Sequence, residues 1–269
     1  MSTIGSLHTM LKNAQRLCGL VWRIIATAFC FSVFGIGGLV LAFIIFPAQR
    51  VFQSDSVKQK IKARKTVHYS FKLFVGLMHL TGVIRFHVED KAKIEGLKGQ
   101  LLLANHPSLI DVVVLISVVK NADCVVKAHL FKNPFMRGVI KSTGYISNDD
   151  PQELLRECER SLQKGNNLIV FPEGTRTEPH KTLKFKRGAA NIAIRCHAPI
   201  TTFLIKMKPN TLTKGTPWYK VAPYQAHFTM RLASQQFNCA AYDNDMPAMQ
   251  SRQLTKDLQH YFTQELKNI

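Results

Sequence analysis

Apolar residues in this chain form one long run near the N-terminus and several short runs further along. The long run, residues 24–46, contains no charged residue and lies between Arg23 and Arg50. A helix rises about 1.5 Å per residue, so a run of this length extends roughly 35 Å, enough to cross a hydrocarbon core of about 30 Å. The pattern therefore predicts an N-terminal membrane-anchoring helical segment.

Two other structures remain open for this run. A signal peptide fits poorly, because its apolar part usually has about 7–15 residues and no small-residue cleavage site follows Pro47 here. Gly35, Gly37 and Gly38 stand near the middle of the run, and they would allow a hairpin that enters one leaflet and returns. The sequence does not decide between a spanning helix and such a hairpin.

The next segment, residues 57–82, has a basic first half and an apolar second half. We predict a helix that lies on the membrane surface with its lysines toward anionic headgroups. An ordinary core helix is an equally good interpretation of the apolar half. More cations follow the anchor than precede it: Arg50, Lys58, Lys60, Lys62, Arg64 and Lys65, against Lys12, Arg16 and Arg23. The positive-inside rule then predicts an inner (cytoplasmic) membrane location, with the rest of the chain facing the cytoplasm.

Short apolar runs alternate with helical patterns from residue 83 onward. Strands are expected at 101–104, 167–170, 198–206, 218–222 and 225–232, and helices at 108–119, 151–164, 189–196 and 251–267. Residues 238–249, rich in Asn, Asp and Pro, are expected to form a loop. The alternation predicts an α/β fold, a mixed sheet flanked by helices, with functional loops at strand ends. The chain is thus divided into an anchor with a basic amphipathic helix, 1–82, and a globular domain, 83–269.

Composition narrows the choice of partners. The formal net charge of +19 suits nucleic acid, anionic lipid or an acidic protein. The basic residues are spread from end to end without a nucleic-acid-binding motif, so no nucleic acid is expected, whereas the apolar run favours lipid. The six cysteines form no Cys-x-x-Cys pair, so neither a zinc site nor a disulfide framework is expected. No glycine-rich nucleotide loop is found, so no bound cofactor is expected.

The first chemical motif is Asn105-His106-Pro107, which directly follows the predicted strand 101–104, with Asp111 five residues after the histidine. Pro107 suits the first helical position, so His106 is expected on the loop before the helix. On one regular helix the two side chains would point about 140° apart, so only the loop placement lets them pair. A carboxylate that holds one ring nitrogen fixes the tautomer and makes the imidazole a better base. A purely structural histidine is the alternative.

The second motif, Phe171-Pro172-Glu173-Gly174-Thr175-Arg176, follows the predicted strand 167–170 in the same way. A glycine turn offers backbone N–H groups and Arg176 offers a guanidinium fork, the groups needed to bind a phosphate. The alternative is a salt bridge between Glu173 and Arg176 in a surface turn. Cations just downstream are either further ligands for an anion or a solvated basic turn: Lys184, Lys186 and Arg187.

Together the two motifs resemble those of glycerolipid acyltransferases of the lysophosphatidic acid acyltransferase family, which carry a histidine followed after four residues by aspartate, and then a phenylalanine-proline-glutamate-glycine-threonine-arginine loop. The resemblance covers residues 83–205. It implies the glycerolipid acyltransferase fold and a membrane-bound enzyme of phospholipid biosynthesis. Such an enzyme moves a fatty acyl chain from acyl-coenzyme A or acyl-carrier protein to the hydroxyl of a lyso-glycerolipid, first of all 1-acyl-sn-glycerol-3-phosphate.

The resemblance also assigns roles. His106 would be the catalytic base, and Asp111 would orient it and balance its charge. Substrate binding would fall to Glu173, Gly174, Thr175, Arg176, Lys184, Lys186 and Arg187, with backbone donors near the Glu173–Gly174 turn steadying the oxyanion. The partners would be anionic membrane lipids, a lyso-lipid acceptor and the acyl donor, without a resident cofactor or metal.

Two departures from the family pattern concern the acceptor. Asp150 stands where the family carries an arginine that helps to bind the acceptor's phosphate, and Thr202 replaces the second proline of a late strand. A different acceptor, such as a lyso-ornithine-type lipid or another lysophospholipid, and a catalytically silent membrane scaffold are therefore the alternative hypotheses.

Overall fold

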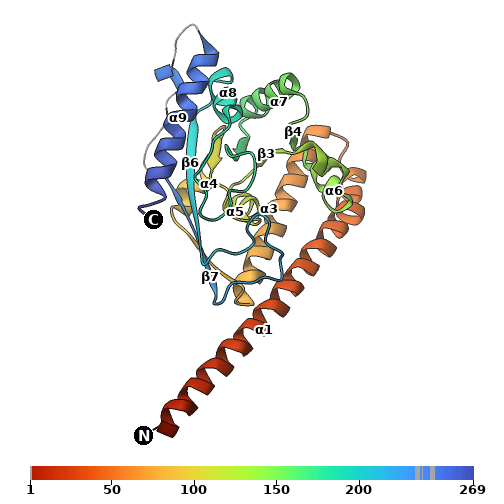
Figure 1. Ribbon diagram of the computed structural model, residues 1–269. Coiled ribbons are helices and arrows are strands. Elements are labelled where there is room, and N and C mark those ends of the chain that lie inside the picture. Colours follow the sequence, from red (N-terminus) through yellow and green to blue (C-terminus); the bar gives the residue numbers. More distant parts are fainter. Residues whose placement is uncertain (1, 234–236, 238, 243–245) are drawn as a thin grey trace.

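The computed structural model describes residues 2–233, 237, 239–242 and 246–269. In this part of the chain one sheet of seven strands has the order β1-β7-β6-β2-β5-β3-β4 (Figure 1). Neighbouring strands are parallel except β6 and β7, which are antiparallel. The strands are β1 (Ile84–Val88), β2 (Leu101–Ala104), β3 (Ala122–Val126), β4 (Ile146–Ser147), β5 (Asn167–Val170), β6 (Ile200–Lys208) and β7 (Ala226–Leu232). The predicted α/β fold with a mixed sheet is confirmed.

Helices cover both faces of the sheet (Figure 1). On β2, Leu102 and Ala104 belong to the core on one side, and Leu101 and Leu103 belong to the core on the other, as the two-residue period of a strand requires. The first core is completed by α3 (Ser56–Leu80), α5 (Asp111–Val118) and α6 (Pro134–Thr143), and the second by α7 (Pro151–Gln163), α8 (Arg187–Arg195) and α9 (Pro247–Glu265). Short helical turns are α4 (Lys91–Glu95), η2 (Ala128–Lys132) and η3 (Cys239–Tyr242).

The predicted apolar run lies in one continuous rod made of α1 (Ser2–Val40), the π-helical turn η1 (Leu41–Ile45) and α2 (Phe46–Val51). Within the described residues this is the one helix long and apolar enough to cross a membrane. The helix continues through the three central glycines, so no hairpin forms there. Its N-terminal end projects from the body, whereas its later part lies along α3 and α6 (Figure 1).

One face of helix α3 packs on α5 in the core, as the core-helix interpretation of residues 57–82 expected. Lys58, Lys62 and Lys65 lie on the exposed face, whereas the Lys60 side chain lies over Gly144 of the body. The position of the basic face at a membrane surface stays a prediction. Arg64, one of the cations counted after the anchor, is buried and forms an ion pair of 2.6 Å with Asp123 of β3. The reason is helical spacing, because Arg64 shares a face with the buried Val67 and His68.

The helix expected from residue 108 begins instead at Asp111. The Asp111 carboxylate accepts hydrogen bonds from the Ser108 backbone N–H (2.7 Å) and the Ser108 hydroxyl (2.5 Å). These bonds hold the preceding residues in a turn, so Pro107 precedes the helix rather than starting it.

The strand expected at 218–222 does not form. Residues 209–225, called the β6–β7 loop below, connect β6 to β7 through turns. Pro217 and Pro223 flank the expected strand and have no N–H to donate to a ladder. Of the loop predicted at 238–249, residues 238 and 243–245 lie outside the described residues, and the helix α9 begins already at Pro247.

Candidate active site

The first motif is positioned by the Asn105 side chain, whose amide bonds the backbone of β6 in the way that a strand residue would. At the end of β2, the Asn105 Nδ2 donates to the Ile205 carbonyl (2.8 Å) and the Ile205 N–H donates to Asn105 Oδ1 (2.7 Å). Asn105 is buried, so both amide atoms gain the partners that burial requires. The pairing of β2 with β6 is thereby extended by one residue, and the chain leaves the sheet at His106.

His106 and Asp111 form the predicted pair. His106 Nδ1 lies 2.7 Å from Asp111 Oδ2, which leaves Nε2 as the nitrogen available to exchange a proton. Asp111 is fully buried at the start of α5. Burial raises the pKa of its carboxyl, and the hydrogen bonds from His106 and Ser108 act in the opposite direction. The contact predicted from the strand-loop-helix placement is thus present, although the helix starts later than expected.

The second motif holds the first in place. Glu173 Oε1 accepts a hydrogen bond from the His106 backbone N–H (2.7 Å), and the Thr177 hydroxyl donates to Glu173 Oε2. The Thr177 N–H in turn donates to the His106 carbonyl (3.0 Å). Glu173 is buried; burial first and the nearby Asp111 charge next raise its pKa to about 7, against the effect of these hydrogen bonds. Its position makes Glu173 a brace between the motifs, where the sequence predicted a substrate ligand.

Phe171 is a site residue that sequence reasoning did not single out. Its ring stacks on the His106 imidazole, with centroids 4.1 Å apart and planes inclined by 22°. The imidazole is therefore fixed by a carboxylate at its edge and an aromatic ring on its face. The signal was present in the sequence, since Phe171 directly follows β5 and β5 is the parallel neighbour of β2.

The glycine turn of the second motif is closed on itself. Gly174 has φ of +68°, and its N–H donates to the Phe171 carbonyl (2.9 Å), so that N–H is not directed at an oxyanion. A Cβ at this position would come within 3.0 Å of Lys186 Cδ. Glycine is thus favoured by the backbone conformation, and the Lys186 side chain lies over the turn. Thr175, also predicted to bind substrate, follows on the same turn.

Arg176 does not form the alternative salt bridge with Glu173. Its Nη1 donates to the carbonyls of Leu212 and Thr213, both at 3.2 Å, which ties the second motif to the β6–β7 loop. Arg176 is half-buried, and one edge of its guanidinium fork is used by these bonds. A guanidinium has five N–H donors, so bonds remain for an anion.

The downstream cations are exposed: Lys184, Lys186 and Arg187. Leu183 and Phe185 pack against the second core, whereas Lys184 and Lys186, which alternate with them, are exposed. Of the two lysines, Lys186 lies next to the glycine turn. Arg187 instead begins α8.

Asp150 has a local structural role. Its side chain accepts hydrogen bonds from the N–H groups of Gln152 (2.7 Å) and Glu153 (2.8 Å) and caps α7, and these bonds lower its pKa. The residue is exposed and follows β4, three strands from β2, which is roughly 14 Å at the usual strand spacing. Capping accounts for an aspartate here.

An apolar cavity of about 340 Å³ reaches His106, and sequence reasoning missed it. Its lining comes from six elements that are scattered along the sequence, namely α1, α3, α5, β3, η2 and α6. A second apolar cavity of about 480 Å³ lies between α1, α3 and α6 and shares Phe34, Phe71 and Phe74 with the first. These rings touch, with Phe34 centroid distances of 5.9 Å to Phe71 and 5.0 Å to Phe74.

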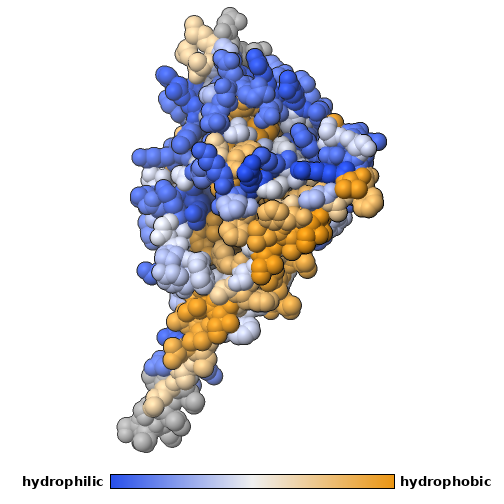
Figure 2. All heavy atoms as spheres, turned by 90° about the vertical axis from the view of Figure 1, so that its right-hand side faces the viewer, coloured by the Kyte–Doolittle hydropathy of each residue, from blue (hydrophilic) through white to orange (hydrophobic). Residues whose placement is uncertain are grey.

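The second cavity opens beside an apolar surface. Exposed apolar side chains recur along α1 at helical spacing, Ile25, Phe29, Val33, Ile36 and Val40, and continue onto α3 with Leu73 and α6 with Phe135. Figure 2 shows apolar side chains gathered in a broad band on this side of the molecule. A patch of this kind marks a protein or membrane contact. Groups of His, Cys, Asp and Glu able to hold a metal are not found among the described residues.

Comparisons with known proteins agree with this geometry. Residues 85–206, which contain both motifs, match the Acyltransferase family model. A 1-acyl-sn-glycerol-3-phosphate acyltransferase from Helicobacter pylori is 30% identical over 136 residues, 48% of this chain and 54% of that protein. The human 1-acyl-sn-glycerol-3-phosphate acyltransferase beta is 29% identical over 139 residues, 49% of this chain and 47% of that protein. The chain thus spans about half the length of these relatives.

The crystal structure of the 1-acyl-sn-glycerophosphate (LPA) acyltransferase from Thermotoga maritima is similar over nearly the whole molecule. It superposes with a TM-score of 0.68 at 20% sequence identity, covering 94% of this chain and 98% of that one. At this identity the similarity establishes the fold. The match of residues 85–206 to the Acyltransferase family model covers both motifs and agrees with the resemblance that they indicated.

Proposed function

We propose that this protein is a membrane-bound acyltransferase that moves a fatty acyl chain from acyl-coenzyme A or acyl-carrier protein to the hydroxyl of a lyso-glycerolipid, with 1-acyl-sn-glycerol-3-phosphate as the acceptor. One observation carries the proposal: the His106–Asp111 pair lies at the edge of an apolar cavity of about 340 Å³. A base beside a chain-sized apolar space suits a reaction between an alcohol and a fatty thioester.

In the proposed reaction His106 Nε2 takes the proton of the acceptor hydroxyl while the hydroxyl oxygen attacks the thioester carbonyl. The tetrahedral intermediate collapses by breaking the carbon–sulfur bond, and the imidazolium returns the proton to the leaving thiolate. Asp111 keeps the proton on Nδ1 and balances the imidazolium, since it contacts that nitrogen at 2.7 Å. A base of this kind contributes about 10²- to 10⁴-fold, and positioning supplies most of the rest.

The acyl chain would occupy the apolar cavity on one side of His106, and the headgroup of the acceptor would lie on the other side, near Arg176 and Lys186. Arg176 supplies the free edge of its fork and Lys186 a point charge over the glycine turn, the two modes by which proteins bind phosphate. Lys184 and Arg187 add charge nearby. Asp150 caps α7, so it gives no argument against a phosphate monoester, and lysophosphatidic acid is retained ahead of the other acceptors.

The contacts of α1 support a helix that lies in one leaflet rather than crossing the bilayer. Contacts with the body recur along the apolar run, from Arg23, bonded to Ala222, through Phe34 to Arg50, whose Nη2 donates to Ser142 (3.0 Å). A helix that is packed on the globular domain over this length cannot cross the bilayer without taking the domain into the lipid. In the proposed orientation the exposed apolar band faces the lipid, and the catalytic domain remains in the cytoplasm.

The test is a product assay with the purified full chain in mixed vesicles. Lysophosphatidic acid, lysophosphatidylcholine and a lyso-ornithine lipid are each offered with acyl-coenzyme A and with acyl-carrier protein, and products are identified by mass spectrometry. The proposal predicts phosphatidic acid from lysophosphatidic acid, and loss of that product in His106→Ala. A different acylated product would reassign the acceptor. Absence of any acylated product would favour the silent scaffold.

A further inference from the structure

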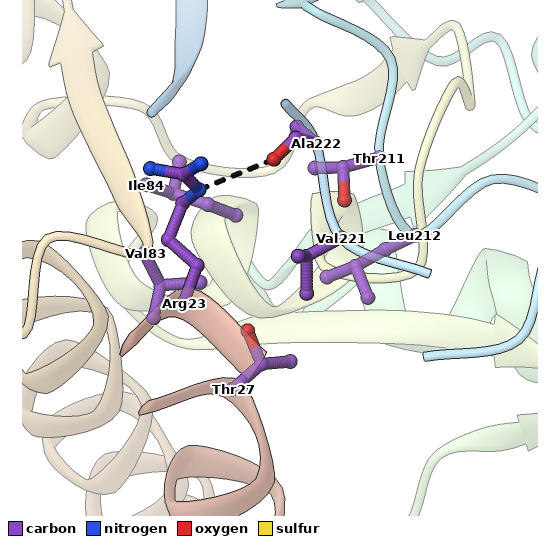
Figure 3. Close-up of a pocket in the computed structure, with 8 residues that line it drawn as sticks. All are labelled: Arg23, Thr27, Val83, Ile84, Thr211, Leu212, Val221 and Ala222. Carbon is purple, nitrogen blue, oxygen red and sulfur yellow. Dashed lines mark hydrogen bonds between the residues drawn. The ribbon is translucent and has the colours of Figure 1, made fainter. Parts of the chain in front are cut away.

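The β6–β7 loop is fastened along α1. Arg23 Nε donates to the Ala222 carbonyl (3.1 Å) (Figure 3), and Arg23 Nη2 donates to the Pro223 carbonyl (2.6 Å). Further along the helix, Phe31 contacts Trp218 of the loop with ring centroids 6.2 Å apart. Arg23 and Phe31 are eight residues apart in α1, about 12 Å along the axis. The loop therefore runs beside the first third of the apolar run.

Little space separates the loop from the helix. The gap beside Arg23 is a cavity of only about 10 Å³, lined by Thr27 of α1 and by Thr211, Leu212 and Val221 of the loop (Figure 3). Such a volume holds one water molecule at most. The loop is packed on α1 as part of one surface, so the depth that α1 takes in a membrane also sets the position of the loop.

The outer side of the loop is aromatic. Trp218, Tyr219 and Tyr224 are 42%, 57% and 62% exposed, and Trp22 of α1 is 56% exposed. Trp218 and Trp22 are the two tryptophans of the chain: Trp218 contacts α1 through Phe31, and Trp22 donates its indole N–H to the Thr81 carbonyl (2.9 Å). Trp and Tyr are the residues that favour the headgroup level of a bilayer, because the ring is apolar and its N–H or O–H needs a polar partner.

Basic residues accompany these rings. Lys12, Arg16 and Arg23 of α1, together with Pro223 and Tyr224 of the loop, line a groove of about 290 Å³, and Lys220 is exposed on the loop. The three cations of α1 face the same groove, at spacings that keep them on one side of a helix. Cations next to interfacial aromatic rings are complementary to anionic lipid headgroups.

We propose that the β6–β7 loop is a second membrane-contacting surface of this protein, which places Trp218 and Tyr219 at the headgroup level of an anionic bilayer beside α1. The inference rests on the membrane association in the proposed function and is independent of the proposed chemistry. It has a structural consequence, because the other end of the same loop holds Arg176 through Leu212 and Thr213. The β6–β7 loop that contacts the membrane in this proposal therefore also holds Arg176, the arginine proposed to bind the acceptor.

The test uses the two tryptophans as separate probes in the full chain. Trp22→Phe leaves Trp218 as the only tryptophan, and Trp218→Phe leaves Trp22. Each variant is mixed with vesicles of phosphatidylcholine and phosphatidylglycerol whose acyl chains carry bromine near the headgroup or near the chain end. The proposal predicts that Trp218 emission shifts to the blue and is quenched more strongly by the shallow bromines. Quenching of Trp22 without quenching of Trp218 would overturn it and leave α1 docking alone.

Vesicle binding gives the second readout. Trp218→Ala with Tyr219→Ala should weaken binding to the anionic vesicles several-fold, whereas Met249→Ala, an exposed apolar residue of α9 on the opposite face of the sheet, should not. Equal binding to the anionic vesicles by the parent chain, the double variant and Met249→Ala would overturn the proposal. Quenching of neither tryptophan would contradict the membrane association itself, and the product assay in detergent then decides the chemistry separately.

Discussion

The backbone N–H of His106 donates a hydrogen bond of 2.7 Å to the carboxylate of Glu173. The two residues belong to motifs that follow neighbouring parallel strands, β2 and β5, so the bond joins the ends of these strands across the site. It explains why a hydrogen-bond acceptor stands at position 173 although the side chain is buried and does not line the apolar cavity. The geometry of the base thus depends on the second motif as well as on Asp111.

Replacement of Glu173 should separate bracing from charge. Glu173→Gln keeps an acceptor for His106 and a group that can bond Thr177, so it should retain much of the activity. Glu173→Ala leaves the His106 N–H buried without a partner, which costs about 1–3 kcal/mol, and should lower kcat strongly. Comparison of kcat and the urea midpoint for the two variants checks this. Equal activity of Glu173→Ala and the parent would remove the bracing role.

The pKa of Glu173 also predicts a pH effect on stability. Burial raises it from 4.5 to about 7, so between these values the unfolded chain loses a proton that the folded chain keeps. The free energy of unfolding therefore falls as pH rises through this window, by roughly 3 kcal/mol at about 1.4 kcal/mol per pKa unit. Glu173→Gln lacks this titration, so its stability relative to the parent should increase from pH 4.5 to 7. A difference in urea midpoints that is independent of pH would contradict the assignment.

Asp111→Asn should impair the reaction by at least about 10²-fold. The carboxylate accepts hydrogen bonds from His106 Nδ1 and from the Ser108 N–H and hydroxyl. The asparagine amide has only one acceptor oxygen, so its NH2 group would face at least one of these donors. The imidazole then adopts the other tautomer or loses its partner. Activity over pH 6–9 provides the measurement, with circular dichroism as the check on folding. A variant with the parent's rate would mean that Asp111 only closes the turn.

Arg176→Lys should discriminate between acceptors. Lysine keeps the charge but loses the fork that bonds the β6–β7 loop and a phosphate together. We expect the acceptor's KM for lysophosphatidic acid to rise about tenfold or more, equivalent to about 1.4 kcal/mol, with a smaller change in kcat and in the KM of the acyl donor. Lys98→Gln, an exposed lysine outside the site, serves as control. An equal rise in both KM values would count against headgroup binding by Arg176.

The cavity beside His106 should set the acyl chain length. Val126 lines it at the end of β3, whereas Val125 points to the opposite core. Val126→Phe should shift the product distribution toward shorter acyl chains, because the larger ring fills part of the 340 Å³. Val125→Phe adds the same volume on the other face of the strand and should leave the distribution unchanged. Competition between acyl donors of different length gives the ratio, and identical shifts in both variants would exclude the cavity as the cause.

Features that depend on residues close together in the sequence, such as the bounds of β2 and β5 and the His106–Asp111 pair, were predicted correctly. Strands β2 and β5 have the predicted bounds, since polar or turn-forming residues follow closely, Asn105 after β2 and Pro172 after β5. The pairing of His106 with Asp111 followed from a turn between them. The strand expected at 218–222 was wrong, and the burial of Arg64 was not predicted, because the partners of these residues, Arg23 and Asp123, are distant in the sequence. The cavity was missed for the same reason. Its wall is assembled from six elements, each of which shows only an ordinary apolar face.

The central claim is that His106 acts as the general base, and the rate of acyl transfer by His106→Ala tests it most directly. The measurement is turnover of acyl-coenzyme A with lysophosphatidic acid under saturating conditions, with thermal unfolding as the control for an intact fold. The account predicts a rate at least about 10²-fold below that of the parent chain with an unchanged unfolding midpoint. Turnover near the parent's rate by the folded variant would contradict it.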